Sequence, residues 1–323
     1  MVRIQRLAVR QQMSLFGRKL GNAIGYMKAR FNARSLLDSV KIHLDEGIDY
    51  IIGHWYESAN FGDASSPVCM HLLSGKTPIN VNSVIDFTRM PVYSVVGSVM
   101  HWIRNERTEV WGSGFLHGSA GFRARPKKVH AVRGPLSREL CLRQGVECPP
   151  IYGDPAVFVF RAFADVKRAS DYVLGIIPHH LDAADPRISR LRSNDRVNVI
   201  DVLRPIEEVV AEVARCEAIV SSSLHGLILA DSLSIPSRWM RLSRVVTRDG
   251  FKFQDYFMSI GRDEETPLDL TETTTVEQIL GEVRDHDQGL DLDGLLEACP
   301  FKMDEITGLD RVPRLYLSQR GTE

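Results

Sequence analysis

Three serines, a histidine and a glycine share one short segment of the chain, Ser221-Ser222-Ser223-Leu224-His225-Gly226. One apolar stretch precedes it and another follows it, which predicts a turn from a buried strand into a helix. His225 then stands at a helix N-terminus, where an imidazole can bind an anion or transfer a proton. Gly226 has no side chain, so a ligand or another backbone can approach it closely. The alternative interpretation is that His225 only caps the turn.

A second candidate for anion binding is Arg133, which precedes Gly134-Pro135. Proline is favoured in the first turn of a helix because the N–H that it lacks has no partner there. A guanidinium at this position can hold a phosphate or a carboxylate through two parallel hydrogen bonds. The alternative is a surface ion pair with Glu139.

Asparagine and aspartate occur together at another predicted strand-to-helix corner, Asn60-Phe61-Gly62-Asp63. Asp63 can orient or deprotonate a sugar hydroxyl, and its residue type also favours a helix N-cap. Two histidines, His117 and His179, follow other predicted strands. We expect His179 and its neighbour His180 to point to opposite sides of the strand, which makes them a poor chelate.

Other patterns argue against metal chemistry and a disulfide framework. The chain lacks H-E-x-x-H and G-x-x-x-x-G-K. Its two D-x-D patterns, 285–287 and 291–293, lie in an acidic stretch that predicts a solvated surface. Five cysteines without a C-x-x-C pair predict reduced thiols in a cytosol. The segment 152–155, Tyr-Gly-Asp-Pro, predicts a turn with a structural aspartate. A formal net charge of -1 gives no attraction to nucleic acid.

These candidates belong to a chain that alternates predicted strands and helices. Strands are predicted over 48–54, 92–96, 109–114, 129–132, 172–177, 197–202, 218–222 and 237–241. Helices are predicted over 65–74, 135–144 and 205–216, from about 225, and over 275–286. This alternation predicts an α/β fold of parallel sheets with right-handed crossovers. Ligands of such sheets bind at the carboxyl ends of the strands, where most of the candidates fall.

We expect two Rossmann-like domains that face each other across a cleft, over residues 46–165 and 166–290. An extension, 1–45, precedes them, and we expect a tail, 291–323, to pack back on the first domain. The extension has no acidic residue before Asp38, and its apolar residues recur at helical spacing. It is either an interfacial helix on anionic lipid or a helix packed on the body or on a second subunit. No stretch approaches the ~20 apolar residues of a transmembrane helix, and no secretory signal is evident.

Seven short segments in order give the chain its resemblance to a known family, over roughly residues 50–262. They are NFGD (60–63), VGS (96–98), WGSGF (111–115), AVRGPLSREL (131–140), YGDPA (152–156), SSSLHGLILAD (221–231) and GFKFQDY (250–256). In this order they resemble the polysaccharide pyruvyl transferase family, in particular its exopolysaccharide ketal-forming enzymes. The resemblance implies a fold similar to the two-domain GT-B glycosyltransferases.

The resemblance also implies phosphoenolpyruvate as donor, phosphate as leaving group, and no cofactor. The product is a pyruvate ketal that bridges two hydroxyls of one sugar. The family's Arg-Leu-His-Gly motif aligns with residues 223–226, so Ser223 stands where the family has arginine. Another cation has to meet the donor, and the available ones are Arg133, Arg241, Arg244 and Lys252.

The hypothesis assigns roles to residues as follows. His225 is the acid or the phosphate binder, and Asp63 is the base on the acceptor side. Donor-binding candidates are Arg133, Ser222, Ser223, Gly226, Lys252 and Arg244, and acceptor-side candidates are Asn60, His117 and His179. By analogy with the family, the acceptor is a lipid-linked oligosaccharide or polysaccharide at the inner face of the membrane. The alternatives are a nucleotide-sugar glycosyltransferase of the same fold and a non-catalytic component of a polysaccharide assembly complex.

Overall fold

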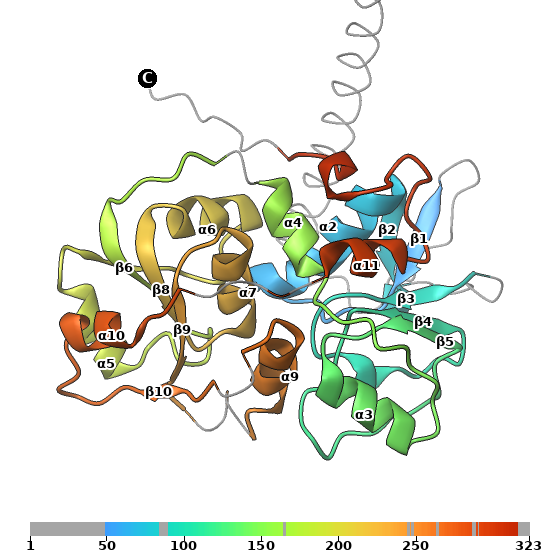
Figure 1. Cartoon of the computed structure of the whole chain (residues 1–323), viewed down its shortest axis with the longest axis horizontal. Helices are drawn as coiled ribbons and strands as arrows, with labels where there is room; N and C mark the ends of the chain where they lie inside the picture. Colours follow the sequence, from blue (N-terminus) through green and yellow to red (C-terminus); the bar gives the residue numbers. More distant parts are fainter. Residues whose placement is uncertain are drawn as a thin grey trace, which may run out of the picture.

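Two parallel sheets of five strands each organise the chain (Figure 1). The computed structural model describes residues 49–83, 90–163, 166–243, 246, 249–262, 265–285, 289 and 291–315. The first sheet has the order β2-β1-β3-β4-β5, with bounds β1 Tyr50–Gly53, β2 Thr77–Asn80, β3 Val92–Ser94, β4 Thr108–Trp111 and β5 Lys128–Ala131. The second has the order β10-β9-β8-β6-β7, with bounds β6 Tyr172–Ile177, β7 Val197–Val199, β8 Cys216–Ser221, β9 Ser237–Arg241 and β10 Leu268–Asp269. Neighbouring strands pair in parallel in both sheets, so the expected α/β fold is confirmed.

Helices connect the strands and cover the sheets. They are α2 Phe61–Ser74, α3 Pro135–Arg143, α4 Ala156–Ala162, α5 Pro186–Arg192, α6 Ile206–Val213, α7 Leu224–Ser232, α9 Phe251–Ser259, α10 Val276–Glu282 and α11 Leu292–Glu297. Short 3-10 helices occupy Val81–Ser83, Met100–Trp102 and Leu309–Arg311. The predicted helix 275–286 ends early, at Glu282, because Arg284 makes an antiparallel bridge to Ser237.

Several elements have no counterpart in the sequence-based prediction. Strand β2 contains Pro78, a residue that argues against a strand when only sequence is considered. Helix α4 is the apolar run AVFVFRA, six of whose seven residues are buried, so it carries no amphipathic pattern. Helices α5, α9 and α11 are also short. Each offers too few residues for a helical periodicity to be read from the sequence.

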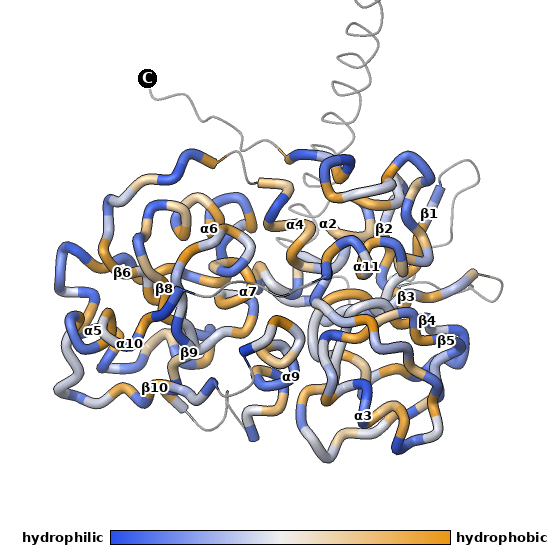
Figure 2. Tube along the Cα trace, in the orientation of Figure 1, coloured by the Kyte–Doolittle hydropathy of each residue, from blue (hydrophilic) through white to orange (hydrophobic). Residues whose placement is uncertain are grey.

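One hydrophobic core runs between the two sheets. It includes Phe61 and Leu72 of α2, Phe158 and Phe160 of α4, and Leu227 of α7. Figure 1 shows these three helices between the sheets, and Figure 2 colours α7 and much of α4 as hydrophobic. The two halves of the chain are therefore held together by packed apolar side chains.

The C-terminal segment returns to the first sheet. Trp111 of β4 donates its indole N–H to the carbonyl of Leu295 in α11 over 2.8 Å, and the rings of Tyr93 and Phe301 lie 4.9 Å apart. Asp291 caps α11, and its carboxylate is exposed, as expected for the D-x-D pattern at 291–293. The exact domain boundaries stay a prediction.

All five cysteines are buried and none is paired in a disulfide. Within the described residues, no cluster of three or more His, Cys, Asp or Glu side chains could hold a metal ion. The helices of that part of the chain include none long and apolar enough to cross a membrane. The basic extension 1–45 lies outside the described residues.

Candidate active site

The starts of helices α2 and α7 meet at the junction of the two sheets. Asn60 caps α2 by accepting a hydrogen bond from the backbone N–H of Gly62 over 2.9 Å. The next N–H, that of Phe61, donates to the carbonyl of Val202 in the second half over 2.9 Å. A Cβ atom on Gly62 would lie 2.0 Å from Nδ1 of His225. Only glycine at this position lets the imidazole lie directly against the first turn of α2.

His225 also faces Asp154, an aspartate that the sequence predicted to be structural. The imidazole Nε2 lies 3.9 Å from Oδ2 of Asp154, and the two side chains are 12% and 0% exposed. Both atoms are buried, and among the described residues neither has a hydrogen-bond partner. The other oxygen of Asp154 accepts from the N–H of Ala156 over 3.1 Å, which fixes the carboxylate. A separation of 3.9 Å is too long for a hydrogen bond, and catalytic contacts of this kind often shorten when a ligand binds.

Burial determines how the two groups ionise. It lowers the pKa of His225 to about 3, with added effects from the positive charges of Lys252 and Arg133 and from His179. It raises the pKa of Asp154 to about 6. At neutral pH the site therefore holds an uncharged imidazole beside a carboxylate. A carboxylate of this kind sets the tautomer of the ring and stabilises it when it gains a proton.

Lys252, in the first turn of α9, supplies positive charge to the same region. Its ammonium lies 5.0 Å from the ring centre of Phe253. The pKa of Asp63 is raised by burial, and a hydrogen bond from Ser58 and the charge of Lys252 oppose that rise. Burial and the charge of Lys252 lower the pKa of His179 to about 3. One ammonium thus influences three of the residues that the sequence singled out: Asp63, His179 and His225.

Asp63 is not the N-cap that its residue type favoured. It occupies the third position of α2, and Asn60 is the cap. Its carboxylate accepts a hydrogen bond of 2.6 Å from the hydroxyl of Ser58. A carboxylate in the first turn also interacts favourably with the helix dipole. Both residues predicted for the acceptor side at this corner are therefore brought to the junction, Asn60 as a buried cap and Asp63 as a partly buried carboxylate.

The serines of the 221–223 segment have separate tasks. Ser222 accepts from the backbone N–H of His179 over 2.9 Å and lies 3.2 Å from a carboxylate oxygen of Asp182. Ser223 is the N-cap residue of α7 but makes no side-chain capping bond. A Cβ on Gly226 would lie 2.4 Å from the hydroxyl of Ser221. The space left by the missing side chain of Gly226 is therefore occupied by Ser221 of the adjoining strand, β8.

Arg133 joins the two halves of the chain instead of facing solvent. Its side chain is 0% exposed and pairs with Asp255 of α9 over 3.0 Å. The guanidinium also donates to Ser98 over 2.6 Å and to the carbonyl of Phe115 over 2.7 Å. The alternative prediction, a surface ion pair between Arg133 and Glu139, was wrong, because Glu139 pairs with Arg143. The charge of Arg133 still reaches His225, whose pKa it helps to lower.

The remaining candidates are dispersed. Nδ1 of His117 lies 3.1 Å from the hydroxyl of Ser119, in a loop outside the junction. The ring centres of His179 and His180 lie 4.2 Å apart, with the rings tilted by 32°, so the prediction that they point apart was wrong, because both residues follow β6 outside the strand. Arg241 forms a two-bonded ion pair with Asp269. Arg244 lies outside the described residues.

Comparison with known proteins bears on the same region. Residues 119–244 match the family model for polysaccharide pyruvyl transferases. The resemblance to this family is thereby confirmed. The match contains both members of the His225–Asp154 pair. Lys252 and Asp63 lie outside the matched residues, and only the tertiary structure brings them next to that segment.

Two curated proteins are similar to the chain over part of its length. An uncharacterized protein of Acanthamoeba polyphaga mimivirus, L143, is 32% identical over 181 residues, which are 54% of this chain and 62% of the viral protein. The succinoglycan biosynthesis protein ExoV of Rhizobium meliloti is 30% identical over 156 residues, 47% of each chain. The chain thus spans about half to three fifths of the length of these relatives.

Sequence reasoning missed Asp154 as a functional candidate. Its setting, Gly153-Asp154-Pro155, is an ordinary turn pattern. The one available signal was its position within a segment of the family resemblance. The pairing with His225 follows only from the packing of α4, which Asp154 precedes, against α7.

Proposed function

We propose that this chain transfers a pyruvyl group from phosphoenolpyruvate to a sugar of a surface polysaccharide precursor and releases phosphate. The observation that carries the proposal is the His225–Asp154 pair at the meeting helix starts, next to the charge of Lys252. The donor binds between the two halves, in a GT-B-like arrangement. The family match and the similarity to ExoV support a role in polysaccharide pyruvylation.

Phosphoenolpyruvate carries a phosphate and a carboxylate, so its site requires positive charge and N–H donors. The N-terminus of α7 offers the positive end of a nine-residue helix dipole, which favours an anion. Lys252 is the cation we assign to the donor in place of the family's arginine, because Ser223 has no charge. Arg133 contributes its charge from the buried junction and keeps α3 and α9 together.

The same charges explain why His225 is uncharged before the donor arrives. A bound anion offsets the burial and the neighbouring cations that lower the pKa of the imidazole. Donor binding therefore favours protonation of His225 at the moment when an acid is needed. Asp154 stabilises the resulting imidazolium.

The reaction then proceeds through proton transfer, addition of a first hydroxyl, loss of phosphate and ring closure. Protonated His225 gives its proton to the methylene carbon of the donor, and the neighbouring carbon becomes oxocarbenium-like. A sugar hydroxyl adds to that carbon and loses its proton to a base, for which Asp63 is our candidate. The C–O bond to phosphate breaks and inorganic phosphate leaves. A second hydroxyl of the same sugar adds to the same carbon and closes the ketal ring, and its proton goes to the released phosphate.

The acceptor in this proposal is a lipid-linked oligosaccharide at the cytoplasmic face of the membrane. The sequence supports this location through the basic apolar stripe of the extension 1–45. Vesicle pelleting tests it: the full chain should sediment with anionic vesicles, and a chain that lacks residues 1–40 should not. Equal sedimentation of both chains contradicts the membrane contact.

The activity is tested by incubating the purified chain with phosphoenolpyruvate and a lipid-linked oligosaccharide. We expect release of inorganic phosphate together with acceptor that gains a pyruvate ketal, detected by mass spectrometry. A parallel incubation with nucleotide sugars distinguishes the glycosyltransferase alternative. Release of a nucleoside diphosphate, with phosphoenolpyruvate left intact, would overturn the proposal. Absence of any turnover across a panel of acceptors would favour the non-catalytic component.

A further inference from the structure

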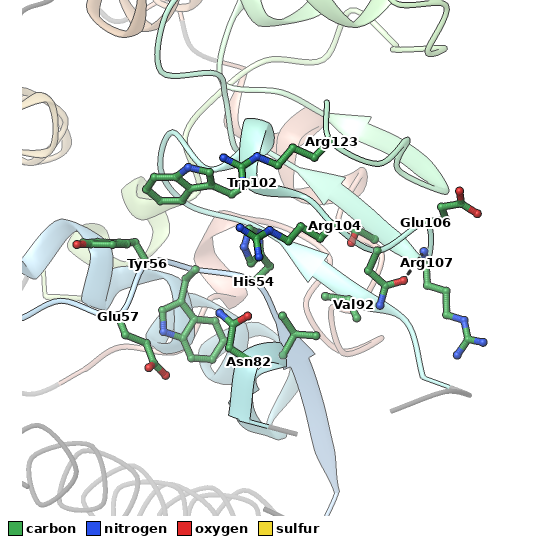
Figure 3. Close-up of a pocket in the computed structure, with 14 residues that line it drawn as sticks. His54, Tyr56, Glu57, Asn82, Val92, Trp102, Arg104, Glu106, Arg107 and Arg123 are labelled. Carbon is green, nitrogen blue, oxygen red and sulfur yellow. Dashed lines mark hydrogen bonds between the residues drawn. The ribbon is translucent and has the colours of Figure 1, made fainter. Parts of the chain in front are cut away.

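The first half contains a cavity of about 1240 Å³ that is separate from the His225–Asp154 pair. It lies at the sheet face opposite α2. A Cβ atom on Gly53, at the end of β1, would meet Met70 of α2 and the ring of Trp55, so the next residue, His54, turns to the other face and Trp55 borders the cavity from the α2 side. Val92 of β3 and Thr108 of β4 line the same face, and Trp102 covers it from the 3-10 helix (Figure 3).

Three aromatic side chains give this cavity surfaces suited to sugar rings. Trp55 and Trp102 line it, and Tyr56 at its edge is 53% exposed. The rings of Tyr56 and Trp102 lie 5.4 Å apart. Tyrosine and tryptophan side chains combine a flat apolar ring face with one polar group, and both can contact a ligand.

Two arginines place positive charge in the same cavity. In Figure 3 the guanidinium groups of Arg104 and Arg123 extend toward Trp102 and His54. Among the described residues no carboxylate forms an ion pair with either arginine. The two glutamates at the rim, Glu57 and Glu106, extend their carboxylates away from the centre in the same view.

His54 adds a buried polar group. Its Nδ1 atom is buried and has no hydrogen-bond partner within the described part of the chain. Burial, with the charge of Arg104 as a second cause, lowers its pKa, so the ring is uncharged at neutral pH. An uncharged imidazole beside two guanidinium groups can donate a hydrogen bond to a hydroxyl or accept one from it. Aromatic faces, hydroxyl partners and cations thus coincide in one cavity.

A row of rings leads from the cavity toward the second half. The ring of His101 lies 4.6 Å from that of Trp102 and 6.0 Å from that of His117. Next to His117, the N–H of Gly118 donates to the carboxylate of Asp249 over 2.8 Å. Asp249 precedes α9, which carries Lys252. An extended ligand seated in the cavity can therefore continue along these rings toward the junction.

We propose that this cavity binds the acceptor as a sugar chain that bears an anionic group, a phosphate or a carboxylate. The sugar rings lie on Trp55 and Trp102, and the anionic group meets Arg104 and Arg123. This inference rests on the proposed function, because the bound sugar chain is an acceptor only if the protein transfers a pyruvyl group to it. It adds to that function a second binding region in the first half, and it assigns to His117 a place along the path of the acceptor.

Binding is measured by tryptophan fluorescence of the full chain. Trp111 and Trp239 are buried at 0% and 2% exposure, so changes on titration report Trp55 and Trp102. The probes are methyl glucoside, glucuronate and glucose 1-phosphate. We expect the two anionic probes to bind at least about tenfold more tightly than the neutral one. A higher affinity for glucose 1-phosphate indicates a phosphate-bearing acceptor, and a higher affinity for glucuronate indicates an acidic sugar.

Arg104→Gln and Arg123→Gln should each weaken binding of the anionic probes about tenfold and leave methyl glucoside unchanged. Arg143→Gln is the matched control, because Arg143 lies on α3, pairs with Glu139 and does not line the cavity, so all affinities should stay unchanged. Equal affinities of the neutral and anionic probes, or equal losses in all three variants, would overturn the inference.

Turnover separates this inference from the proposed function. With phosphoenolpyruvate and lipid-linked acceptor, the cavity variants should raise the KM for the acceptor about tenfold and leave the KM for the donor unchanged. If probes bind through the arginines but no donor is consumed, the sugar site stands and the proposed function fails. If donor is consumed normally and the cavity variants leave the acceptor KM unchanged, the inference alone fails.

Discussion

The ring of His225 lies against the backbone of Gly62, so that a Cβ atom on Gly62 would be 2.0 Å from Nδ1. Two helix starts from different sheets are thus in direct contact at the residue to which we assign acid chemistry. The contact explains why a glycine occupies the first turn of α2 although glycine weakens a helix.

Gly62→Ala should displace the imidazole of His225 and reduce phosphate release strongly. Alanine is the better helix former by about 1 kcal/mol, but overpacking at this contact costs about 1–3 kcal/mol, so the net loss of stability is modest. The control is Gly281→Ala in α10, where an added Cβ meets nothing within 4 Å. That variant should keep full activity and gain stability. Phosphate-release kinetics and urea unfolding measure both effects, and normal kinetics in Gly62→Ala would contradict the contact.

The Arg133–Asp255 pair predicts a large loss of stability when it is broken from one side. Arg133→Met leaves Asp255 charged and buried, which costs about 3–5 kcal/mol. Asp255 also accepts from the N–H and hydroxyl of Ser137 at the start of α3, and these bonds do not replace the lost positive charge. The comparison is Arg143→Gln, which removes an ion pair whose side chains are 66% and 52% exposed, and it should change stability by less than about 1 kcal/mol. Guanidinium unfolding that gives equal midpoints for the two variants would refute the assignment.

His225→Ala and Asp154→Asn should each lower phosphate release by about 10²–10⁴-fold, since one removes the proposed acid and the other its charged partner. His130→Gln is a matched control, because His130 pairs with Glu109 over 2.8 Å on the first sheet, away from the junction. It should retain turnover within about twofold. Full ketal formation by His225→Ala would defeat the assignment.

The two buried groups predict opposite dependences of stability on pH. The folded pKa of His225, about 3, lies below its value of about 6.5 in the unfolded chain, so His225 makes stability rise with pH between these values. The folded pKa of Asp154, about 6, lies above its usual 3.8, so Asp154 makes stability fall as pH rises from about 4 to 6.

The variants separate these contributions. Relative to the unmodified chain, Asp154→Asn should gain stability as pH rises from 4 to 6, and His225→Gln should lose it, by at most about 1.4 kcal/mol per pH unit each. Urea unfolding at a series of pH values measures the differences. Parallel curves for all three proteins would show that neither group titrates as its burial requires.

Lys252→Met tests the cation assigned to the donor. We expect the KM for phosphoenolpyruvate to rise about tenfold or more, because an ammonium that meets a phosphate is lost. The pKa of His225 should also rise, since the charge of Lys252 is one cause of its depression. Lys128→Met, an exposed lysine on β5, is the control and should change neither quantity. Donor kinetics and a histidine NMR titration measure the two effects, and an unchanged donor KM would assign the donor to another cation.

Local pattern predicted the strands that contain runs of Ile and Val and the helices with clear apolar periodicity. It also placed His225 and Asp63 at strand-to-helix corners, because each corner is written in consecutive residues. Helix α4 escaped prediction, since its apolar run AVFVFRA has no polar face when both sides are buried between the sheets. Strand β2 escaped because Pro78 argues against a strand unless the neighbouring pairing is known.

By itself the sequence determined the parallel α/β architecture, the family resemblance and the histidine at a helix start. Periodicity, turn residues and short motifs are properties of neighbouring residues, so they are legible in one dimension. Only the tertiary structure decided that His225 meets Asp154 and Gly62, that Arg133 is held by Asp255, and that aromatic and arginine side chains form a cavity. Those relationships join segments far apart in the chain, and the packing of α2, α4, α7 and α9 between two sheets brings them together.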